Sequence, residues 1–412
     1  MLSDEVVEKV IERLVERIEQ VNVDVISQIG KSIVKLGTVS PSKAQQLIQI
    51  LRYGGDYDQI KRKLKQITKL NIKDIERIFK EVAKQNYQFA EQFYKYRNKK
   101  YIPFDQNEPL QNQIKTLSKV AAKDYYNLTK TSAIGFTSLD PIKNKVIFKG
   151  LEKTFVDALD KAVLAVLQGK TTFKDELHNI VKTLGKSGLK TVNYKSGRAI
   201  RLDSAVRMNL RAAIRNFHNE NQKLLGEQFD SDGVEISVHE NPAPDHENVQ
   251  GRQFTNRAYN DLNDGKTVKD YTGIVCTLDH DHKNGFRPIS TMNCYHYTFS
   301  IVLGVSKPQY NDKQLKQIIE DNNKGFMYKG KHYTNYEGTQ MQRRMETEIR
   351  KLKDQQIFAR QTNDVDTIAK VQPKIRMLSK KYKQFSQVAN LPTKSDRMRV
   401  SNYKVVANSK LI

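Results

Sequence analysis

Apolar residues recur at the spacing of an amphipathic helix over most of this 412-residue chain. Val7, Ile11, Leu14 and Ile18 share one face of such a helix, while Glu and Arg residues occupy much of its remaining circumference. Only 38% of the residues are hydrophobic and the mean hydropathy is −0.66, which is low for one compact globule. Long helices that bury a narrow apolar stripe explain both observations. The sequence therefore predicts a mainly α fold.

The chain divides by pattern into three predicted regions. Residues 1–185 predict an extended helical N-terminal region, because turn signals are few there. Residues 186–335 predict a small α+β module, with two short strands joined at Ser196-Gly197 and another strand over Val234 to His239. Residues 336–412 predict a helical basic tail.

Caps, prolines and glycines predict where the helices begin and end. A first helix begins at Ser3, a second runs from about Val25 to Leu36, and Pro41 starts a third. A short helix capped by Thr172 is expected to stop at Gly185. Further helices are expected over Asp203 to Phe229, Asp312 to Asp321, Thr339 to Gln361 and Val365 to Ser386, with a hairpin over Phe326 to Tyr333 that turns at Lys329-Gly330.

The charge is strongly positive and predicts a negatively charged partner. Lys and Arg total 70 against 46 Asp and Glu, a formal net charge of +24. From Met341 to Ile412 there are 17 basic residues against 6 acidic ones. Such a tail can run along DNA, because phosphate neutralisation is independent of sequence, or can dock on an acidic protein surface. Candidate contact residues are Arg207, Arg211 and Arg215, which lie four apart in one helical row, and Arg343, Arg344, Arg350 and Lys351; the alternative is a solvated surface stripe.

The stretch from Asp245 to Tyr310 concentrates four of the eight histidines and both cysteines. A tetrahedral zinc site with sulfur and imidazole ligands is one interpretation of this composition. The alternative is structural, with a buried cysteine and histidines whose ring nitrogens bind backbone carbonyls and hold a loop-rich fold together. The ligands would be His246, Cys294 and His296, with Cys276, His280 or His282 as the fourth.

A DHDH segment in the same stretch gives an enzymatic alternative. The residues from Leu278 to Arg287 resemble HNH-type nucleases, in which a histidine activates water and neighbouring side chains hold Mg²⁺. Asn293 stands in a plausible later position, but the paired CxxC zinc knuckles usual in such small nucleases are absent from the sequence. The sequence also has no P-loop, no GxSxG elbow and no GxGxxG after a strand. We therefore expect no catalysis and no nucleotide cofactor.

The N-terminus and the hydropathy pattern bear on location. The sequence begins acidic, without a basic segment followed by an apolar run, so a signal peptide is not expected. No segment approaches the roughly 20 apolar residues of a membrane helix. With only two cysteines, we expect a protein made in a reducing compartment.

The order of short motifs resembles the phage minor capsid protein 2 family, the Mu F-like head morphogenesis proteins. We expect this similarity over about Lys195 to Lys353, with little over the N-terminal helices. The motifs are Asp245-His246, Gln250-Gly251 followed by Phe254, Asn293-Cys294-Tyr295-His296 and Gly304 to Pro308, flanked by Arg201 to Met208 and Tyr333 to Arg343. The motif residues singled out are Asp245, Gly251, Asn293, Gly304 and Pro308.

The resemblance implies a non-catalytic minor head protein. A few copies would enter the capsid, associate with the portal and assist head assembly and DNA packaging or ejection. The implied partners are the portal, other capsid or scaffolding proteins and phage DNA bound without sequence specificity. The implied location is the virion, inside the capsid near the portal, after assembly in the host cytoplasm. The alternatives are a metal-dependent DNA nuclease using the Asp279 to His282 segment, and a non-viral DNA-associated structural protein.

Overall fold

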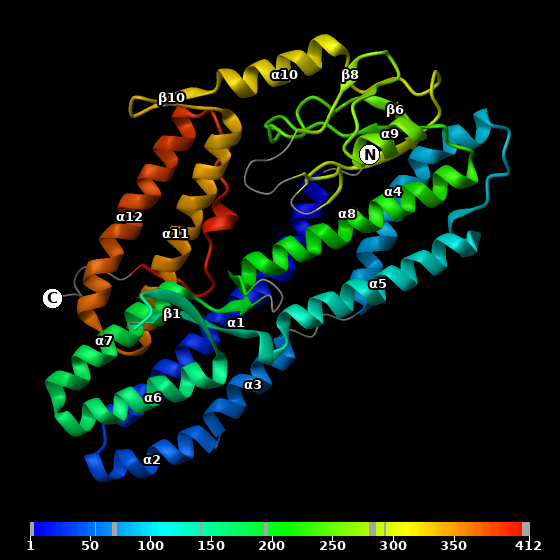
Figure 1. The fold of residues 1–412 in the computed structure, drawn as a ribbon. Helices are drawn as coiled ribbons and strands as arrows, with labels where there is room; N and C mark the ends of the chain where they lie inside the picture. Colours follow the sequence, from blue (N-terminus) through cyan, green and yellow to red (C-terminus); the bar gives the residue numbers. More distant parts are fainter. Residues whose placement is uncertain are drawn as a thin grey trace. The chain divides into compact units, whose positions relative to one another are not determined.

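The computed structural model describes residues 4–53, 55–67, 72–140, 142–192, 197–279, 286–291 and 294–405. Helices dominate and the strands form small antiparallel sheets, so the predicted mainly α class with a small α+β module is confirmed (Figure 1). None of the described helices is long and apolar enough to cross a membrane.

The chain forms two compact units that are interleaved along the sequence. Unit 1 comprises Met1–Ile11, Asn71–Lys123 and Met208–Gln340. Unit 2 comprises Glu12–Leu70, Asp124–Arg207 and Met341–Ile412. The division into three regions by sequence order stays a prediction beside these two units.

Helix α1 is longer than expected. It runs without interruption over Asp4–Gly37, so the prediction of a separate helix from Val25 was wrong. The reason is that its apolar stripe continues through Ile18, Val25, Ile29 and Ile33, all buried, and the first glycine in this span is Gly30. The helices α2 (Pro41–Tyr53) and α3 (Gly55–Ile67) follow.

A β-hairpin interrupts the N-terminal region, which was expected to be helical. Asp140 shapes its turn, because Oδ1 accepts hydrogen bonds from the backbone N–H groups of Ile142 and Lys143 at 2.9 and 3.1 Å, and Asn144 follows with φ of 47°. In the four-stranded sheet the order is β2-β1-β3-β4. The strands are β1 (Ile134–Asp140), β2 (Lys145–Gly150), β3 (Lys190–Val192) and β4 (Ala199–Arg201).

Two helices separate the hairpin from β3. They are α6 (Leu151–Gln168) and α7 (Lys170–Ser187). Helix α7 passes through Gly185, where it was expected to stop. A Cβ at this glycine would lie 2.6 Å from the Cα of Gln355, so the glycine permits close packing rather than ending the helix.

The helices α11 (Asn335–Gln361) and α12 (Val365–Val388) confirm the two helices predicted for the tail. In unit 2 the residues of α11 from Met341 onward pack against α12 through Leu352, Val371 and Ile375 (Figure 1). Polar pairs reinforce the contact, since Gln356 donates to Gln372 at 2.9 Å and the Tyr382 hydroxyl donates to Glu346 at 2.9 Å.

Unit 1 contains an aromatic core between helices. Phe79 stacks on Phe217 with ring centroids 4.2 Å apart, and Asn86 donates to Asn221 at 2.8 Å in the same buried layer. These contacts join α4 (Ile72–Tyr96) to α8 (Leu202–Gln228), and Asn221 also donates to Gln113 of α5 (Glu108–Thr129) at 3.1 Å. Helix α8 confirms the predicted helix from Asp203. Among the residues that the structure describes, the 3-10 turns are η1 (Phe104–Gln106), η2 (Thr131–Ala133) and η3 (Ser395–Met398).

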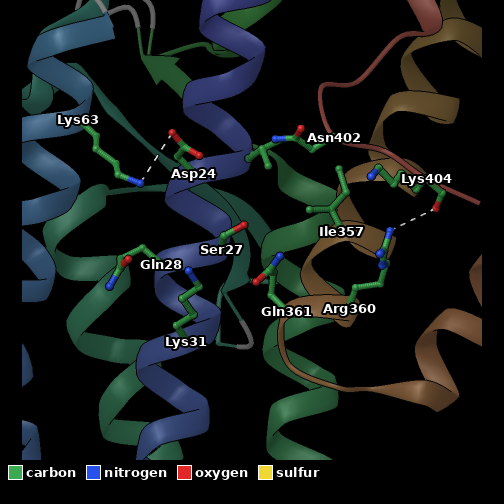
Figure 2. A pocket seen from close by; sticks show the side chains of 11 residues that line it. Asp24, Ser27, Gln28, Lys31, Lys63, Ile357, Arg360, Gln361, Asn402 and Lys404 are labelled. Atoms are coloured by element: carbon green, nitrogen blue, oxygen red, sulfur yellow. Dashed lines mark hydrogen bonds and ion pairs between the residues drawn. The ribbon is translucent and has the colours of Figure 1, made fainter. Parts of the chain in front are cut away.

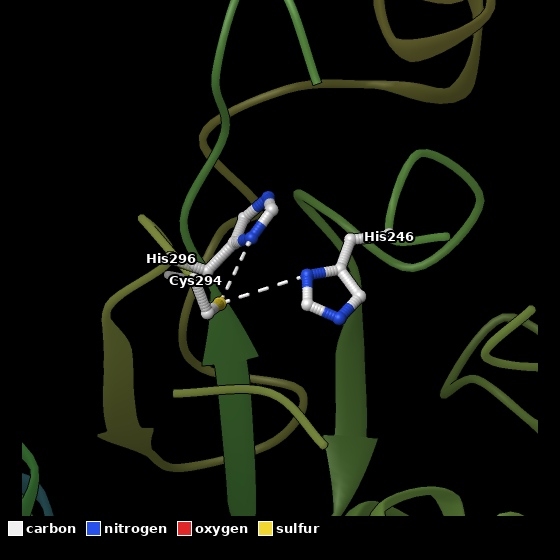
Figure 3. A group of neighbouring side chains, drawn as sticks. All are labelled: His246, Cys294 and His296. Atoms are coloured by element: carbon white, nitrogen blue, oxygen red, sulfur yellow. Dashed lines mark hydrogen bonds between the residues drawn. The ribbon is translucent and has the colours of Figure 1, made fainter. Parts of the chain in front are cut away.

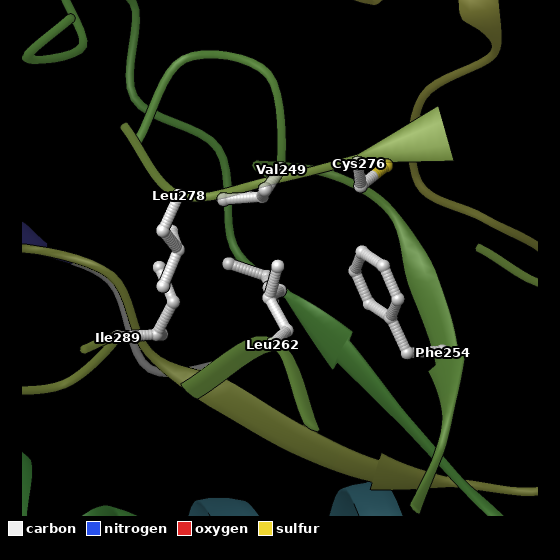
Figure 4. Packing of buried hydrophobic residues seen from close by; sticks show 7 residues of the cluster. Val249, Phe254, Leu262, Cys276, Leu278 and Ile289 are labelled. Atoms are coloured by element: carbon white, nitrogen blue, oxygen red, sulfur yellow. The ribbon is translucent and has the colours of Figure 1, made fainter. Parts of the chain in front are cut away.

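The small sheets of unit 1 surround a second core. A three-stranded sheet has the order β6-β5-β9, and β7 pairs with β8. Figure 4 shows the cluster beside them, formed by Ile236, Val249, Phe254, Leu262, Cys276, Leu278 and Ile289. The elements are β5 (Gly233–Ile236), β6 (Gln253–Thr255), α9 (Asn256–Asn263), β7 (Val268–Lys269), β8 (Val275–Cys276) and β9 (Thr298–Ile301), followed by α10 (Asp312–Lys324), β10 (Phe326–Tyr328) and β11 (Lys331–Tyr333), as expected for the helix and hairpin after Pro308.

Candidate functional site

Three predicted ligand residues meet at one edge of the β5–β9 sheet. The strands are antiparallel, with Ile236 opposite Thr298, so the chain leaving β5 and the chain entering β9 lie at the same edge. This brings His246 to Cys294 and His296, although 48 residues separate His246 from the cysteine. Figure 3 shows both imidazole rings turned toward Cys294 Sγ, which lies 3.6 Å from His246 Nδ1 and 3.5 Å from His296 Nδ1. All three side chains are buried. We call them the His–Cys cluster.

The other nitrogen of each ring, Nε2, also has a hydrogen-bond partner. His246 Nε2 lies 2.9 Å from the carbonyl oxygen of Arg287, and His296 Nε2 lies 3.4 Å from Gln250 Oε1. The backbone N–H of Ser290 donates to Cys294 Sγ at 3.3 Å. These contacts fix the orientation of both rings and of the thiol.

Charged residues support the loops that carry the cluster. Arg287 donates two hydrogen bonds of 2.6 Å to the buried Asp245 carboxylate, and Arg215 donates to the carbonyl oxygen of Cys294. A bidentate arginine–carboxylate pair is strong and directional. Asp245, predicted as a motif residue, therefore positions Arg287, whose carbonyl holds His246.

The electrostatic setting favours a thiolate beside one protonated ring. Burial alone would raise the pKa of Cys294, but the hydrogen bond and charge of His246 bring that pKa below its ordinary value. Burial alone would lower the pKa of His246, but its contacts with Cys294 raise that pKa overall. Burial, with the charges of His239, His246 and Arg287, holds the pKa of His296 well below its ordinary value. The cluster thus offers one sulfur and one neutral imidazole at neutral pH.

The structure does not bring Cys276 to this group. Its side chain is buried in the apolar cluster of Figure 4, and its Sγ lies 3.5 Å from the carbonyl oxygen of Ile274. Burial raises the pKa of this thiol to about 11, which disfavours a thiolate ligand. His280, His282 and Asn293 lie outside the described residues.

Two of the remaining motif residues are glycines with positive φ angles. Gly251 is buried with φ of 70°, and a Cβ there would lie 2.5 Å from the Leu315 side chain and 2.7 Å from that of Val238. Only glycine fits both requirements. Gly304, with φ of 75°, and Pro308 are exposed.

The arginines of the predicted row on α8 have hydrogen-bond or ion-pair partners within their own units. In unit 2, Arg207 pairs with Glu12. In unit 1, Arg211 donates to the Tyr295 hydroxyl at 3.1 Å, and Arg215 is buried against Cys294. These guanidinium groups have partners inside the protein, so the row is not simply a solvated stripe.

Some of the predicted contact residues of α11 also have partners inside the protein. Arg350 is buried and pairs with Asp203. Lys351 forms an ion pair of 3.1 Å with Glu348, whereas Arg344 is exposed.

Helix α12 carries a basic face that contains none of the predicted contact residues. Ile368, Val371 and Ile375 bury one side of this helix, and exposed residues such as Lys370 and Lys374 face away from that side. Asp366 is the one acidic residue in the helix, and it pairs with Lys174 at 3.1 Å. The basic face of α12 consists of Lys370, Lys374, Arg376, Lys380, Lys381 and Lys383, all exposed.

A polar pocket of about 390 Å³ lies elsewhere in unit 2 (Figure 2). Lys63 approaches Asp24 at 4.0 Å across it, and Arg360 donates to the carbonyl oxygen of Lys404 at 3.5 Å. Its lining contains four basic side chains and one acidic one, so it adds to the positive potential of this unit.

Comparison with known proteins identifies the family. Searches of curated proteins and of solved structures returned no significant match. The family model of phage minor capsid protein 2 matches residues 2–387. This match extends well beyond Lys195 to Lys353 and takes in the N-terminal helices, so the expectation of little similarity there was wrong. The chain therefore belongs to the phage minor capsid protein 2 family, whose members are structural proteins of the phage head and reside in the virion with other capsid proteins.

Proposed function

We propose that this minor capsid protein associates with the portal inside the capsid and assists head assembly and DNA packaging or ejection. Family membership supports the structural role in the head. The basic face of α12 supports a negatively charged partner, because six exposed cationic side chains lie on one 24-residue helix. Phage DNA and an acidic portal surface both have the required charge.

The basic face of α12 is accessible to a partner, unlike two of the arginines that were predicted as contact residues. Arg215 and Arg350 are buried, whereas the cations of α12 are exposed. Cations that can reach phosphate groups release condensed counterions and bind DNA without reading its sequence. We therefore place non-specific DNA contact on α12.

Co-expression with the portal protein of the same phage tests portal association. Affinity capture through a tag on the portal, followed by mass measurement of the complex, is carried out at low and at moderate salt. We expect a complex that survives moderate salt, because a specific interface has contacts besides exposed charge pairs. Failure to form a complex even at low salt would contradict portal association.

The family indicates a non-enzymatic role, and a DNA cleavage assay tests the nuclease alternative directly. We expect no cleavage with Mg²⁺. Mg²⁺-dependent cleavage that disappears in His280→Ala would favour a nuclease over the structural role alone.

A further inference from the structure

A backbone carbonyl fixes the tautomer of His246. Its Nε2 lies 2.9 Å from the carbonyl oxygen of Arg287, and a carbonyl oxygen can only accept a hydrogen bond. Nε2 therefore carries the hydrogen. In the neutral ring the lone pair is then on Nδ1, which faces Cys294 Sγ at 3.6 Å (Figure 3).

Gln250 fixes the tautomer of His296 in the same way. The backbone N–H of His239 donates to Gln250 Oε1 at 2.9 Å, which identifies this end of the amide as the oxygen. The same oxygen lies 3.4 Å from His296 Nε2 and must accept from it. The Nδ1 lone pair of His296 consequently also faces Cys294 Sγ, at 3.5 Å.

With both rings neutral, as they must be to bind a metal ion, two nitrogen lone pairs converge on one buried sulfur. A thiol has a single hydrogen, so it can satisfy one of the two nitrogens. The second nitrogen would face sulfur lone pairs in a buried position, which is costly. The backbone N–H of Ser290 already donates a hydrogen bond to the sulfur. A cation between the three atoms satisfies all of them.

The distances match those of tetrahedral zinc. Bonds of about 2.3 Å to sulfur and about 2.0–2.1 Å to nitrogen, at a tetrahedral angle, place the sulfur and nitrogen ligands about 3.6 Å apart. The two sulfur–nitrogen distances are 3.6 and 3.5 Å, and all three ligand atoms lie within 4.8 Å of one another. An oxygen acceptor behind each ring is the usual support of a zinc-bound histidine.

We propose that His246, Cys294 and His296 bind one zinc ion. Among the described residues no further His, Cys, Asp or Glu side chain joins the group. Sulfur and imidazole donors suit zinc and not Mg²⁺ or Ca²⁺, which require oxygen ligands. The ion joins the loop after β5 to the segment before β9, which hydrogen bonds within the strands alone do not fix. This site is independent of the proposed portal association.

Metal content of the full-length protein is the first test. The protein is equilibrated with zinc, dialysed extensively and measured for zinc per chain. We expect about one zinc per chain, and a loss of about tenfold or more in Cys294→Ala and in His246→Ala. Cys276→Ala is the matched control, because it removes the other buried cysteine, and it should retain the full zinc content.

Cobalt substitution keeps the test valid if the alanine variants fail to fold. Co²⁺ bound by one thiolate and two imidazoles in the wild-type protein should give tetrahedral d–d bands and a thiolate-to-cobalt charge-transfer band. Wild-type protein that retains less than about a tenth of an equivalent of zinc and shows no such bands would overturn the proposal. Equal zinc in wild type and a folded Cys294→Ala variant would do the same.

Discussion

Glu19 is a single carboxyl group that makes the stability of unit 2 depend on pH. It is 5% exposed, and its Oε2 has no hydrogen-bond partner among the described residues. Burial, together with the nearby charge of Asp203, raises the pKa of Glu19 to about 8 from an ordinary value of 4.5. The folded protein therefore keeps a proton that the unfolded chain releases in acid.

The sign of this pH dependence follows from proton binding. Between about pH 4.5 and pH 8 the folded state binds more protons at Glu19, so the free energy of unfolding falls as pH rises through this window. At about 1.4 kcal/mol for each unit of pKa difference, the loss is roughly 3–5 kcal/mol. Glu19→Gln should abolish this slope and be more stable than wild type above pH 8.

Urea unfolding at a series of pH values measures the effect of Glu19→Gln. Glu152→Gln, at an exposed position of α6, is the control and should follow the wild-type curve. A wild-type stability that is flat between pH 5 and pH 8 would contradict the role given to Glu19.

Gly251→Ala tests the close approach of three segments at one backbone position. The new Cβ would lie 2.5 Å from Leu315 and 2.7 Å from Val238, at φ of 70°. We expect a loss of roughly 1–3 kcal/mol from overpacking, in addition to backbone strain. Gly330→Ala separates the two causes, because φ is 76° there and nothing lies within 4 Å of its Cβ. Equal losses in both variants, measured by thermal unfolding, would show that packing at Gly251 is unimportant.

The candidate site was predictable from the sequence only in part. Cys294 and His296 stand two residues apart, and His246 was named with them, but nothing in the residue types distinguished the second cysteine. Cys276 differs because Phe254, Leu262 and other apolar side chains surround it. Supporting groups such as Gln250 and the carbonyl of Arg287 depend on the paths of loops, which no periodicity predicts.

At the scale of elements, most helices were predicted, but the full length of α1, the end of α7 and a short hairpin were missed. The apolar spacing of α12 and the turn of β10–β11 at Lys329-Gly330 were local signals and were confirmed. Strand β1 of the β1–β2 hairpin also pairs with β3, which lies about 55 residues later in the chain. The sequence alone does not distinguish such a turn from a break between two helices, because the partner strand β3 is distant along the chain.

The basic face of α12 gives a prediction for DNA binding. Replacing Lys374, Lys380 and Lys383 by Gln removes three exposed charges without touching the buried side of the helix. Affinity for duplex DNA should fall, and the slope of log affinity against log salt should decrease by up to about three.

A matched triple variant keeps this test specific to α12. Lys115, Lys119 and Lys123 are exposed on α5, and their replacement by Gln changes the net charge equally. Fluorescence anisotropy over a range of salt concentrations compares the two variants. Equal slopes would place DNA contact elsewhere, because net charge alone would then explain the binding.

At the scale of the whole molecule, a buried group of hydrogen-bonded side chains joins all three chain segments of unit 2. Asp354 accepts a hydrogen bond of 2.9 Å from Asn22 and one of 2.6 Å from Arg201. Asp354→Ala would leave the Arg201 guanidinium buried with one carboxylate fewer, at a cost of roughly 3–5 kcal/mol. Denaturant unfolding measures this loss in the free energy of unfolding. Hydrogen exchange of the backbone amides of α6 and α7 then shows whether unit 2 is destabilised.

A second aspartate of the same region serves as the comparison. Asp366 is exposed, and its pair with Lys174 is a surface contact, so Asp366→Ala should leave the stability close to that of the wild type. A similar small change for Asp354→Ala would mean that this buried group does not hold the three segments together.

The distance along the chain between these partners sets the order of folding during synthesis. Asn22 and Asp354 are separated by 332 residues, so α1 emerges from the ribosome long before its partner exists. Contacts between such distant residues form slowly, and partly folded chains expose apolar surface meanwhile. Unit 2 is therefore completed only after the segment that begins at Met341 has been synthesised. A nascent chain halted before Asp354 would hold Arg201 without this counter-charge and the apolar stripe of α1 without α11 to cover it.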